Sequence, residues 1–200
     1  MESNLLLGEH VIMPFQDKPF NGDTFMCEKF IELKKKFNIN AAVELGAAVG
    51  GTTKWLCENF ERVYAIELNP AYRNVCLQRI AKFENVNCLL GSTVEELPKV
   101  LNYIGDNTIF HIDSHWGGNN PLLEELELIT KKGLKPVLEI HDFKVPGNDG
   151  LGYDVYGNIS YEWNWIKNSI EKMYGPDGYI VEYNSMAVGA KRGAIYIYSK

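Results

Sequence analysis

The sequence has little cysteine and no strong cluster of basic charge. Its four cysteines, Cys27, Cys57, Cys76 and Cys88, form no C-x-x-C pair, which disfavours a zinc ribbon and a disulfide framework. Lysine and arginine number 20 against 26 aspartates and glutamates, so the formal net charge is -6. A general nucleic-acid binder needs clustered positive residues. We therefore expect reduced thiols and no nucleic-acid partner.

Long hydrophobic runs are also missing. No apolar run approaches the roughly 18 residues of a membrane span, although 46% of the residues are hydrophobic. The beginning of the chain, MESNLLLGEH, lacks a basic leader followed by a cleavable hydrophobic region. We expect a cytoplasmic protein without a membrane partner, and a length of 200 residues favours a single domain over 1–200.

Short hydrophobic runs of strand length alternate with helical patterns along the chain. Five runs of strand length come first: AAVEL, RVYAIEL, VNCLL, TIFHID and PVLEIHDF. Helical patterns lie before, between and after them, at 22–37, 52–60, 70–83, 94–103, 121–131 and 162–174. This alternation predicts an α/β fold with a doubly wound, mostly parallel sheet. The last two runs, YIVEYNSM and GAIYIYSK, have a short connection and predict an antiparallel hairpin, which makes seven strands.

A glycine-rich turn follows the first predicted strand in AAVELGAAVGGTT. Glu44 ends the strand, and Gly46, Gly50 and Gly51 turn the chain into a helix that starts near Thr52. Glycines permit sharp turns and close approach of a ligand, and a helix N-terminus favours an anion. Glu67 ends the second strand, where a carboxylate can accept hydrogen bonds from both hydroxyls of a ribose.

The turn does not match the usual phosphate-binding motifs. In the dinucleotide pattern G-x-G-x-x-G, the second glycine would fall on Ala48, and in GGTTK the lysine, Lys54, follows the hydroxyls instead of preceding them. A cofactor that has a ribose but no pyrophosphate, namely S-adenosylmethionine, fits better. We expect the helix start and Thr52 or Thr53 to receive its amino-acid carboxylate.

The segments VELGAAVGGTT and VYAIELNP resemble the first two motifs of class I S-adenosylmethionine-dependent methyltransferases, and look most like the macrocin-type and catechol-type O-methyltransferase branch. The resemblance implies a Rossmann-like methyltransferase fold. The third strand's LLGST is similar to the segment that lines the adenine. The cofactor-binding residues that the resemblance implies are Glu44, Gly46, Ala47, Gly50, Thr52, Thr53, Glu67, Leu68, Gly91, Ser92, Thr93 and Asp113.

Titratable residues follow the fourth and fifth predicted strands. HIDSHWGGNN and PVLEIHDFKVPG place Asp113, His115, His141 and Asp142 at neighbouring strand ends, which is a concentration typical of an active site. We interpret His111, inside the fourth strand, as a structural residue that is packed or hydrogen-bonded in the sheet.

The resemblance also implies a metal site, because metal-dependent members of that branch bind a divalent cation such as Mg²⁺ through acids at the positions of Asp113 and Asp142. Catechol-type enzymes carry Asn after the second acid, where this chain has Phe143, so His115 or His141 would supply the third ligand. An imidazole ligand would favour Mn²⁺, Fe²⁺ or Zn²⁺ over Mg²⁺. The alternative is that Asp113 caps the following helix while His141 and Asp142 form a metal-free polar wall. The catalytic candidates are then His115, His141 and Asp142, with His115 or Asp142 as the general base.

The segment Lys144–Trp165 is long, rich in glycine and aromatic, and we expect it to form a loop beside the substrate. Its rings either contact an apolar or sugar face of the substrate or pack against the final helix or a homodimer interface; they are Tyr153, Tyr156, Tyr161, Trp163 and Trp165. Its charged residues are further candidates for substrate contact: Lys144, Asp149 and Asp154. Residues 1–38 are expected to form an N-terminal helical segment.

The favoured hypothesis is an S-adenosylmethionine-dependent O-methyltransferase for a small hydroxylated molecule, a sugar or a secondary metabolite, with or without a divalent metal. The segments IDSHW and HDF look like macrocin-type and cephalosporin-hydroxylase-like enzymes, many of which act on such substrates. One alternative is an NAD-linked oxidoreductase or a metal hydrolase on a similar sheet. Ala48 disfavours the oxidoreductase, and the lack of an H-x-H or H-E-x-x-H motif disfavours the hydrolase. Another is a non-catalytic module that keeps the cofactor pocket.

Overall fold

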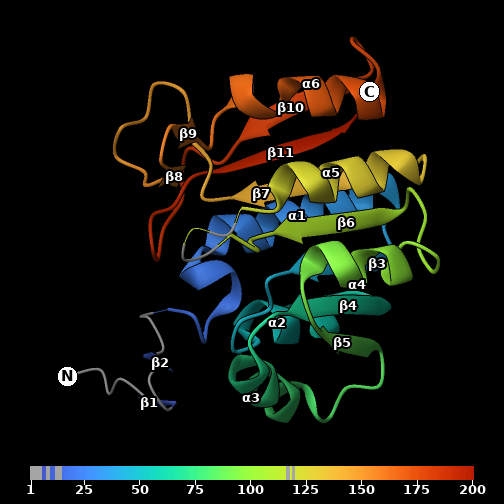
Figure 1. Cartoon of the computed structure of the whole chain (residues 1–200), viewed down its shortest axis with the longest axis vertical. Helices are drawn as coiled ribbons and strands as arrows, with labels where there is room; N and C mark the ends of the chain where they lie inside the picture. The colour runs from blue at the N-terminus through green and yellow to red at the C-terminus, as the bar shows by residue number, and fades with distance from the viewer. Residues whose placement is uncertain (1–5, 8–9, 12–14, 116–117, 119) are drawn as a thin grey trace.

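The computed structural model describes residues 6–7, 10–11, 15–115, 118 and 120–200. Its main element is a seven-stranded sheet in the order β10-β11-β7-β6-β3-β4-β5 (Figure 1). Strand β11 runs antiparallel to β10 and β7 on either side of it. The strands are β3 (Ala41–Leu45), β4 (Arg62–Glu67), β5 (Val86–Leu90), β6 (Thr108–Ile112), β7 (Val137–His141), β10 (Tyr179–Tyr183) and β11 (Ala194–Ser199). The predicted mostly parallel sheet with a C-terminal antiparallel hairpin is confirmed.

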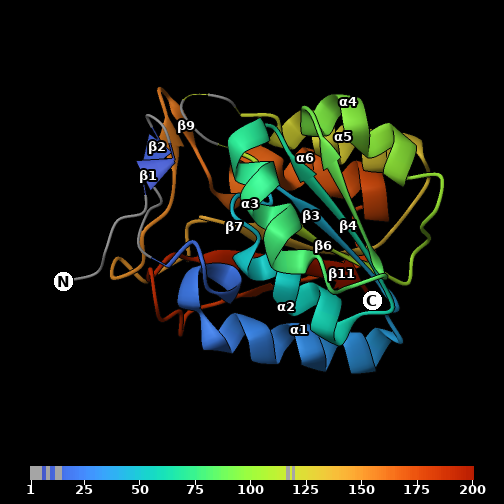
Figure 2. The ribbon, with the colours of Figure 1, turned by 90° about the horizontal axis from the view of Figure 1, so that it is seen from below.

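Helices cover both faces of the sheet (Figure 2). One buried cluster joins the sheet to α1 (Thr24–Phe37), α2 (Gly51–Asn59) and α3 (Pro70–Ile80). A second cluster joins the opposite face to α4 (Thr93–Val100), α5 (Leu122–Lys131) and α6 (Trp163–Tyr174). Strands β3, β6 and β7 are buried along their whole length, which explains why their sequences read as continuous hydrophobic runs.

The helix ends follow local sequence signals. The carboxylate of Asp23 accepts hydrogen bonds from the backbone N–H groups of Phe25 at 3.0 Å and Met26 at 3.4 Å, so it caps α1. Asn38 ends the same helix in the left-handed conformation with φ 50°. Asn69 caps α3, with Pro70 in its first turn. Asn69 lies two residues after Glu67, the acid that ends β4.

Two segments differ from the prediction. Within residues 1–38, which we expected to be helical, the α-helix is α1. A short antiparallel pair, β1 (Leu6–Leu7) and β2 (His10–Val11), and the 3-10 helix η1 (Pro19–Gly22) precede it. The segment after β7 contains a small hairpin, β8 (Val155–Tyr156) with β9 (Ile159–Ser160).

Residues 1–5, which hold part of the stretch that we examined for a leader, lie outside the described residues. Among the described residues, no helix is long and apolar enough to cross a membrane.

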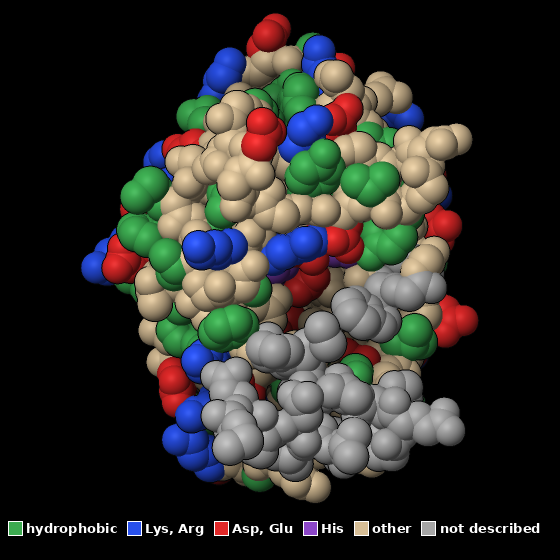
Figure 3. Space-filling view, turned by 90° about the vertical axis from the view of Figure 1, so that its left-hand side faces the viewer, with side chains coloured by type: hydrophobic (Ala, Val, Ile, Leu, Met, Phe, Trp, Pro, Cys, Tyr) green, Lys and Arg blue, Asp and Glu red, His purple; other side chains and the backbone are tan. Residues whose placement is uncertain are grey.

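The strand order creates a switch point between β3 and β6. The chain moves from β3 through β4 to β5 at one edge, and then returns to place β6 on the other side of β3. Ligands of doubly wound sheets bind beyond the carboxyl ends of the strands at such a point. Figure 3 faces this end of the sheet and shows acidic and histidine side chains gathered in a hollow, with basic side chains beside them.

Candidate functional site

A cavity of about 510 Å³ lies at the carboxyl ends of the parallel strands. Residues that follow β3, β4 and β5 line one part of it, and residues that follow β6 and β7 line the rest, together with Asp154 and Arg192 from later loops. It also includes Gln16 and Asn21 from the segment before α1. The cavity therefore joins the two groups of residues that the sequence predicted separately.

Glu67 is held in this cavity by backbone donors. Its Oε2 accepts a hydrogen bond from the N–H of Ala48, and its Oε1 accepts one from the N–H of Asn69, each at 2.7 Å. Burial raises the pKa of Glu67 above its ordinary value, while these N–H bonds oppose the rise. A carboxylate has about four acceptor positions, so the two backbone bonds leave capacity for the hydroxyls of a ligand.

Ala48 adopts an unusual backbone conformation to make its contact. Its φ of 46° lies in the left-handed region that non-glycine residues rarely adopt. This conformation accompanies the bond from its N–H to the carboxylate of Glu67. The absent second glycine of the dinucleotide pattern is therefore replaced by an alanine that contacts the acid of β4 and lines the cavity.

The glycines of the turn allow protein segments to approach one another. Gly46 has φ +94°, and a Cβ placed on it would lie 2.2 Å from the carbonyl oxygen of Asp113. A Cβ on Gly50, which has φ +80°, would lie 2.7 Å from Sγ of Cys76. Gly46 also lines the cavity, whereas Gly50 does not. The sharp turn expected at Gly50 is confirmed, and contact of Gly50 with a ligand stays a prediction.

The hydroxyls at the start of α2 are used inside the protein. Thr52 Oγ1 accepts a hydrogen bond from the N–H of Phe20 at 2.8 Å. Thr53 Oγ1 donates to Glu44 at 2.5 Å, and Glu44 is only 1% exposed. Burial raises the pKa of Glu44 well above its ordinary value. None of the three lines the cavity. The hydroxyls of Thr52 and Thr53 fix the turn in this structure, and their contact with a cofactor carboxylate stays a prediction.

The predicted cofactor-binding residues therefore divide into two sets. Those that line the cavity are Gly46, Glu67, Leu68, Ser92, Thr93 and Asp113. Those that do not line it are Glu44, Ala47, Gly50, Thr52, Thr53 and Gly91. Both sets were predicted from their positions in the motifs. A position in a motif does not show whether a side chain faces the cavity or the core.

The four titratable residues expected at the ends of β6 and β7 lie together. His141 Nδ1 is 3.2 Å from Asp142 Oδ1 and 3.6 Å from Asp113 Oδ2. His115 Nε2 is 3.6 Å from Asp113 Oδ1. Burial by itself would lower the pKa of His141, but Asp142 and Asp113 raise it well above its ordinary value. Both histidines are buried. Asp113, His115 and Asp142 line the cavity, whereas His141 does not.

His115 has a second set of partners on its other nitrogen. Its Nδ1 lies 3.1 Å from Asp154 Oδ2 and 3.3 Å from the Tyr156 hydroxyl, which itself donates to Asp154 at 2.7 Å. Its ring packs against Tyr161 with the centroids 4.5 Å apart. Burial would lower the pKa of His115, but the hydrogen bond to Asp154 and the nearby carboxylates raise it. Nε2 is buried and has no hydrogen-bond partner among the described residues.

Arg192 is a site residue that the sequence analysis missed. Its Nε donates to Asp142 Oδ1 at 2.5 Å, and its Nη2 donates to Asp154 Oδ1. Burial by itself would raise the pKa of Asp142, but His141 and Arg192 hold it well below its ordinary value. Asp142 also has a left-handed backbone with φ 55°, a strained conformation of the kind found at functional sites. No short motif marks Arg192, because it precedes β11, far along the chain from Asp142.

Two groups of side chains have the spacing of a metal site. The ligand atoms of Asp113, His141 and Asp142 lie within 4.8 Å of one another, and so do those of His115, Asp142 and Asp154. Both groups include Asp142, whose carboxylate already accepts the bond from Arg192. Each group also contributes an imidazole, whereas Mg²⁺ prefers oxygen ligands. The predicted set Asp113, Asp142 and His115 is neither of these two groups, and its imidazole does not suit Mg²⁺.

His111 has the structural role that we expected. It is 3% exposed and its Nδ1 contacts Glu139 on the adjacent strand. Its ring lies edge-on against Phe20, with the centroids 5.1 Å apart. This contact connects the sheet to η1 and not to the cavity.

The aromatic residues of 144–165 lie outside the cavity lining, and two of them, Tyr156 and Tyr161, pack against His115. None of Tyr153, Tyr156, Tyr161, Trp163 and Trp165 lines the cavity, and Tyr161 is fully buried between His115 and Trp165. Lys144 lies 3.3 Å from Glu162 instead of reaching the site. Of this segment's candidates, Asp154 does line the cavity. Trp116, part of the IDSHW segment, lies outside the described residues.

Glu125 is a second residue that the sequence analysis missed. It is fully buried in α5, and its Oε1 accepts hydrogen bonds from Ser114 at 2.6 Å and from Thr93. Burial raises the pKa of Glu125 above its ordinary value. Because Ser114 and Thr93 line the cavity, Glu125 fixes two polar groups of its wall from behind.

The comparison with known proteins concerns the fold. No family model and no curated protein matches this chain. Among solved structures, the O-methyltransferase TomG from Streptomyces achromogenes, in complex with SAM, is similar with a TM-score of 0.64 and 15% identity over 88% of this chain and 79% of TomG. The O-methyltransferase from Bacillus cereus, in complex with SAH, has a TM-score of 0.61 and 18% identity over 97% of this chain and 84% of its own.

A third similar structure belongs to a protein with a different name. Precorrin 8w decarboxylase from Methanobacterium thermoautotrophicum has a TM-score of 0.54 and 17% identity over 94% of this chain and all of its own. Identities this low establish the fold and not the activity. The chain therefore shares the Rossmann-like fold of O-methyltransferases, as the sequence predicted.

Proposed function

We propose that the protein is an S-adenosylmethionine-dependent O-methyltransferase that acts on a small hydroxylated molecule. The observation that carries this proposal is the single cavity, which joins Glu67 at the end of β4 to Asp113 and His115 after β6. Solved O-methyltransferases with SAM or SAH bound have the same fold. The cavity volume of about 510 Å³ lies in the range of small-molecule sites.

The residues near β4 and β5 suit the adenosyl part of the cofactor. Glu67 retains acceptor capacity for the two ribose hydroxyls, which donate hydrogen bonds. Leu68 is 60% exposed beside it, so its apolar side chain is available to the face of the adenine. Ser92 and Thr93 line the same part of the cavity. When bound, the cofactor supplies a methyl group that its sulfonium has already activated.

His115 is the base in this proposal. An alcohol is a poor nucleophile at neutral pH, so a positioned base assists by accepting its proton as the methyl group is transferred. The contact of Nδ1 with Asp154 favours a proton on that nitrogen, which leaves Nε2 of the neutral ring to accept the proton of the substrate hydroxyl. The buried Nε2 without a partner in the described chain supports this assignment.

The second part of the cavity suits a polar substrate. Asp113 and Ser114 line it with groups that donate or accept hydrogen bonds, and none of the five aromatic side chains of 144–165 does. This lining favours a molecule with several hydroxyls, such as a sugar or a glycosylated secondary metabolite. Both groups of side chains with metal-site spacing share Asp142, which already accepts a bond from Arg192, so the proposed reaction contains no metal-dependent step.

Calorimetric titration with S-adenosylhomocysteine tests the cofactor site. Glu67→Gln removes the charge that accepts the ribose hydroxyls, and charged hydrogen bonds contribute about 1.5–3 kcal/mol, so we expect affinity to fall about 10- to 100-fold. Glu61→Gln is the matched control, since Glu61 is exposed next to the opposite end of β4, and its affinity should match that of the unmodified protein. Undetectable binding to the unmodified protein, or an unaffected Glu67→Gln variant, would contradict the proposal.

A second assay separates the alternatives. Release of S-adenosylhomocysteine with a panel of sugars and other hydroxylated acceptors reports methyl transfer. A non-catalytic module would bind the cofactor product and release none, and an NAD-linked oxidoreductase would bind NADH, which fluorescence detects.

A further inference from the structure

The antiparallel strand β11 brings the start of its own sequence to the functional edge of the sheet. It pairs Ala194 with His141, the last residue of β7. Arg192 lies two positions before Ala194, and therefore just beyond the carboxyl end of β7. A parallel strand would bring its last residues to this edge instead. The hairpin thus delivers a cation to the place where the acids of β6 and β7 converge.

Arg192 engages two carboxylates at once. Its Nε donates to Asp142 and its Nη2 donates to Asp154, so one guanidinium connects the end of β7 to the segment that carries His115's partner. A guanidinium is planar, always positive at physiological pH, and has five donors in a fixed fork. All three side chains line the cavity.

Gly152 shows that the position of Arg192 is closely defined by the fold. The N–H of Gly152 donates to the carbonyl of Lys191, and the N–H of Gly193 donates to the carbonyl of Gly152, each at 2.9 Å. A Cβ on Gly152 would lie 2.7 Å from Nη1 of Arg192. The two segments are therefore connected on both sides of Arg192, and a side chain at residue 152 would displace the guanidinium from this position.

The same arrangement affects binding of a metal ion. Asp142 belongs to both groups of side chains that have metal-site spacing, and Asp154 belongs to one of them. A divalent cation at either group would lie within a few ångströms of the guanidinium and compete with it for these oxygens. Like charges at such separations repel strongly away from bulk water. The carboxylates cannot serve both cations well.

We propose that Arg192 is the resident cation of this site and occupies the role that a divalent metal has in metal-dependent members of the O-methyltransferase branch. It is a positioning residue: it holds Asp142 at the cavity wall and fixes Asp154, which in turn orients His115. The inference rests on the proposed function for the reaction that the site performs. Its central statement, that the site does not bind a divalent cation while Arg192 is present, is tested independently of that reaction.

The experiment is a titration with Mn²⁺, in which electron paramagnetic resonance measures the free ion. The unmodified protein should bind no Mn²⁺ with a Kd below about 1 mM at this site. Arg192→Met frees two carboxylates, and because affinity for hard cations depends on the charge of the ligand set, Mn²⁺ should bind at least about tenfold more tightly. Lys191→Met is the matched control, since it removes one positive charge from the same turn without touching Asp142 or Asp154, and should resemble the unmodified protein.

Further variants and measurements make each outcome decisive. Micromolar Mn²⁺ binding by the unmodified protein that disappears in Asp142→Asn would overturn the inference, as would equal affinity in the unmodified protein and Arg192→Met. If circular dichroism shows that Arg192→Met is unfolded, Arg192→Gln carries the same prediction. Titration of the unmodified protein with S-adenosylhomocysteine detects failure of the proposed function separately, whatever the result with Mn²⁺.

Discussion

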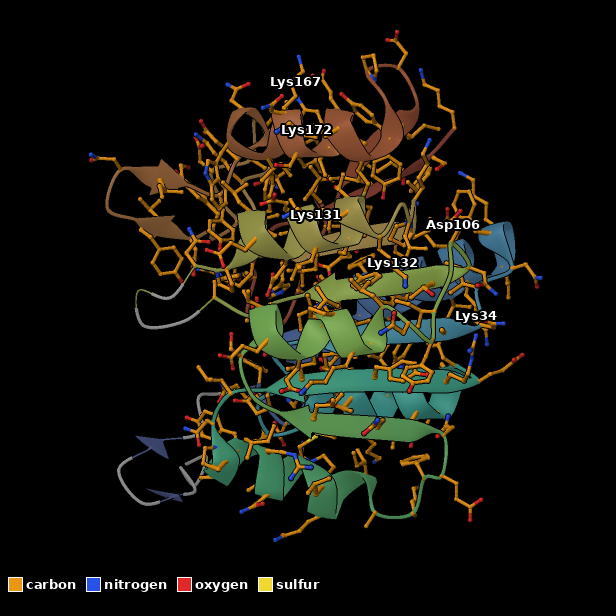
Figure 4. The ribbon with its side chains drawn as sticks, turned by 45° about the vertical axis from the view of Figure 1, so that its right-hand side comes forward. Lys34, Asp106, Lys131, Lys132, Lys167 and Lys172 are labelled. Atoms are coloured by element: carbon orange, nitrogen blue, oxygen red, sulfur yellow. The ribbon has the colours of Figure 1, made fainter. Side chains whose placement is uncertain are left out.

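The two ends of the parallel strands use charge in different ways. At the carboxyl end, Asp142, Asp154 and Arg192 are partly buried and converge on one cavity. At the opposite end, exposed charges join loops: Lys132 Nζ donates to Asn102 at 2.8 Å, and Asp106 accepts a backbone bond at 2.7 Å. Figure 4 shows Lys34 and Asp106 at that end, and four lysines on or next to α5 and α6.

The difference concerns the cost of removing a charge from water. Burying an ion is expensive unless partners compensate, so the carboxyl end requires the network of Asp113, Asp142, Asp154, Arg192 and two histidines. Exposed pairs at the other end need no such compensation and contribute little to stability. The location of these partly buried, mutually dependent charges supports the proposal that the carboxyl end of the strands is the functional end.

The largest expected effect comes from His115 at the carboxyl end. His115→Gln removes the proposed base, and general-base catalysis contributes about 10²- to 10⁴-fold, so kcat for methyl transfer should fall by that factor. Affinity for S-adenosylhomocysteine should change less than about twofold, because the ribose contacts at Glu67 remain. His111→Gln is the contrasting variant, since His111 contacts Glu139 away from the cavity; it should lower stability but not kcat of the folded protein. A His115→Gln variant with full activity would exclude His115 as the base.

The second effect concerns the partner of His115. A base must be neutral to accept a proton, and Asp154 raises the pKa of His115 above its ordinary value. The rate should therefore increase as the pH rises through this raised pKa. Asp154→Asn should lower the pKa of His115, shift the midpoint of the kcat profile to lower pH, and reduce kcat by up to about 100-fold through lost orientation.

Tyr156→Phe provides the control for this shift. It removes only the hydroxyl that contacts Asp154 and His115, and it should cause a smaller change in the profile. Nuclear magnetic resonance titration of the imidazole measures the pKa directly. An unchanged midpoint in Asp154→Asn would show that Asp154 does not control His115.

The third effect concerns stability and the turn between β3 and α2, next to the proposed cofactor site. Thr53→Val deprives the buried Glu44 of its donor, and an unsatisfied buried polar group costs about 1–3 kcal/mol. The free energy of unfolding in urea should fall by that amount, while the Kd for S-adenosylhomocysteine stays within about twofold. Thr53→Ser keeps the hydroxyl and should be much closer to the unmodified protein. A large loss of cofactor affinity with unchanged stability would restore Thr53 as a ligand-binding residue.

The smallest effect is expected at the opposite end of the sheet. Lys132→Ala removes the exposed contact with Asn102 and should change the free energy of unfolding by less than about 0.5 kcal/mol. kcat should stay unchanged within the error of the assay. An activity loss comparable to that of Asp154→Asn would remove the distinction between the two ends.

Local sequence patterns were sufficient for the sheet and for one half of the site. Hydrophobic runs and helical periods predicted the order of elements because burial of each element follows its own residue pattern. Residues that follow adjacent parallel strands meet at one edge, so Asp113, His115, His141 and Asp142 could be placed together before any coordinates. Glu67 was identified on the same basis.

Only the tertiary structure showed which side chains face the cavity and which face the core. Thr52 and Thr53 stand in a ligand-binding motif, yet their hydroxyls contact Phe20 and Glu44. Side-chain partners of this kind depend on how distant segments pack, which local periodicity does not encode.

The sequence by itself determined the strands, the helices and the edge at which the acids and histidines gather, because these follow from short-range patterns. Tertiary structure decided that Arg192 and Asp154 join them, since Arg192 is separated by 50 residues from Asp142 and by 38 from Asp154. The antiparallel register of β11 against β7 is the physical reason: it alone brings that arginine to the carboxyl end of the sheet.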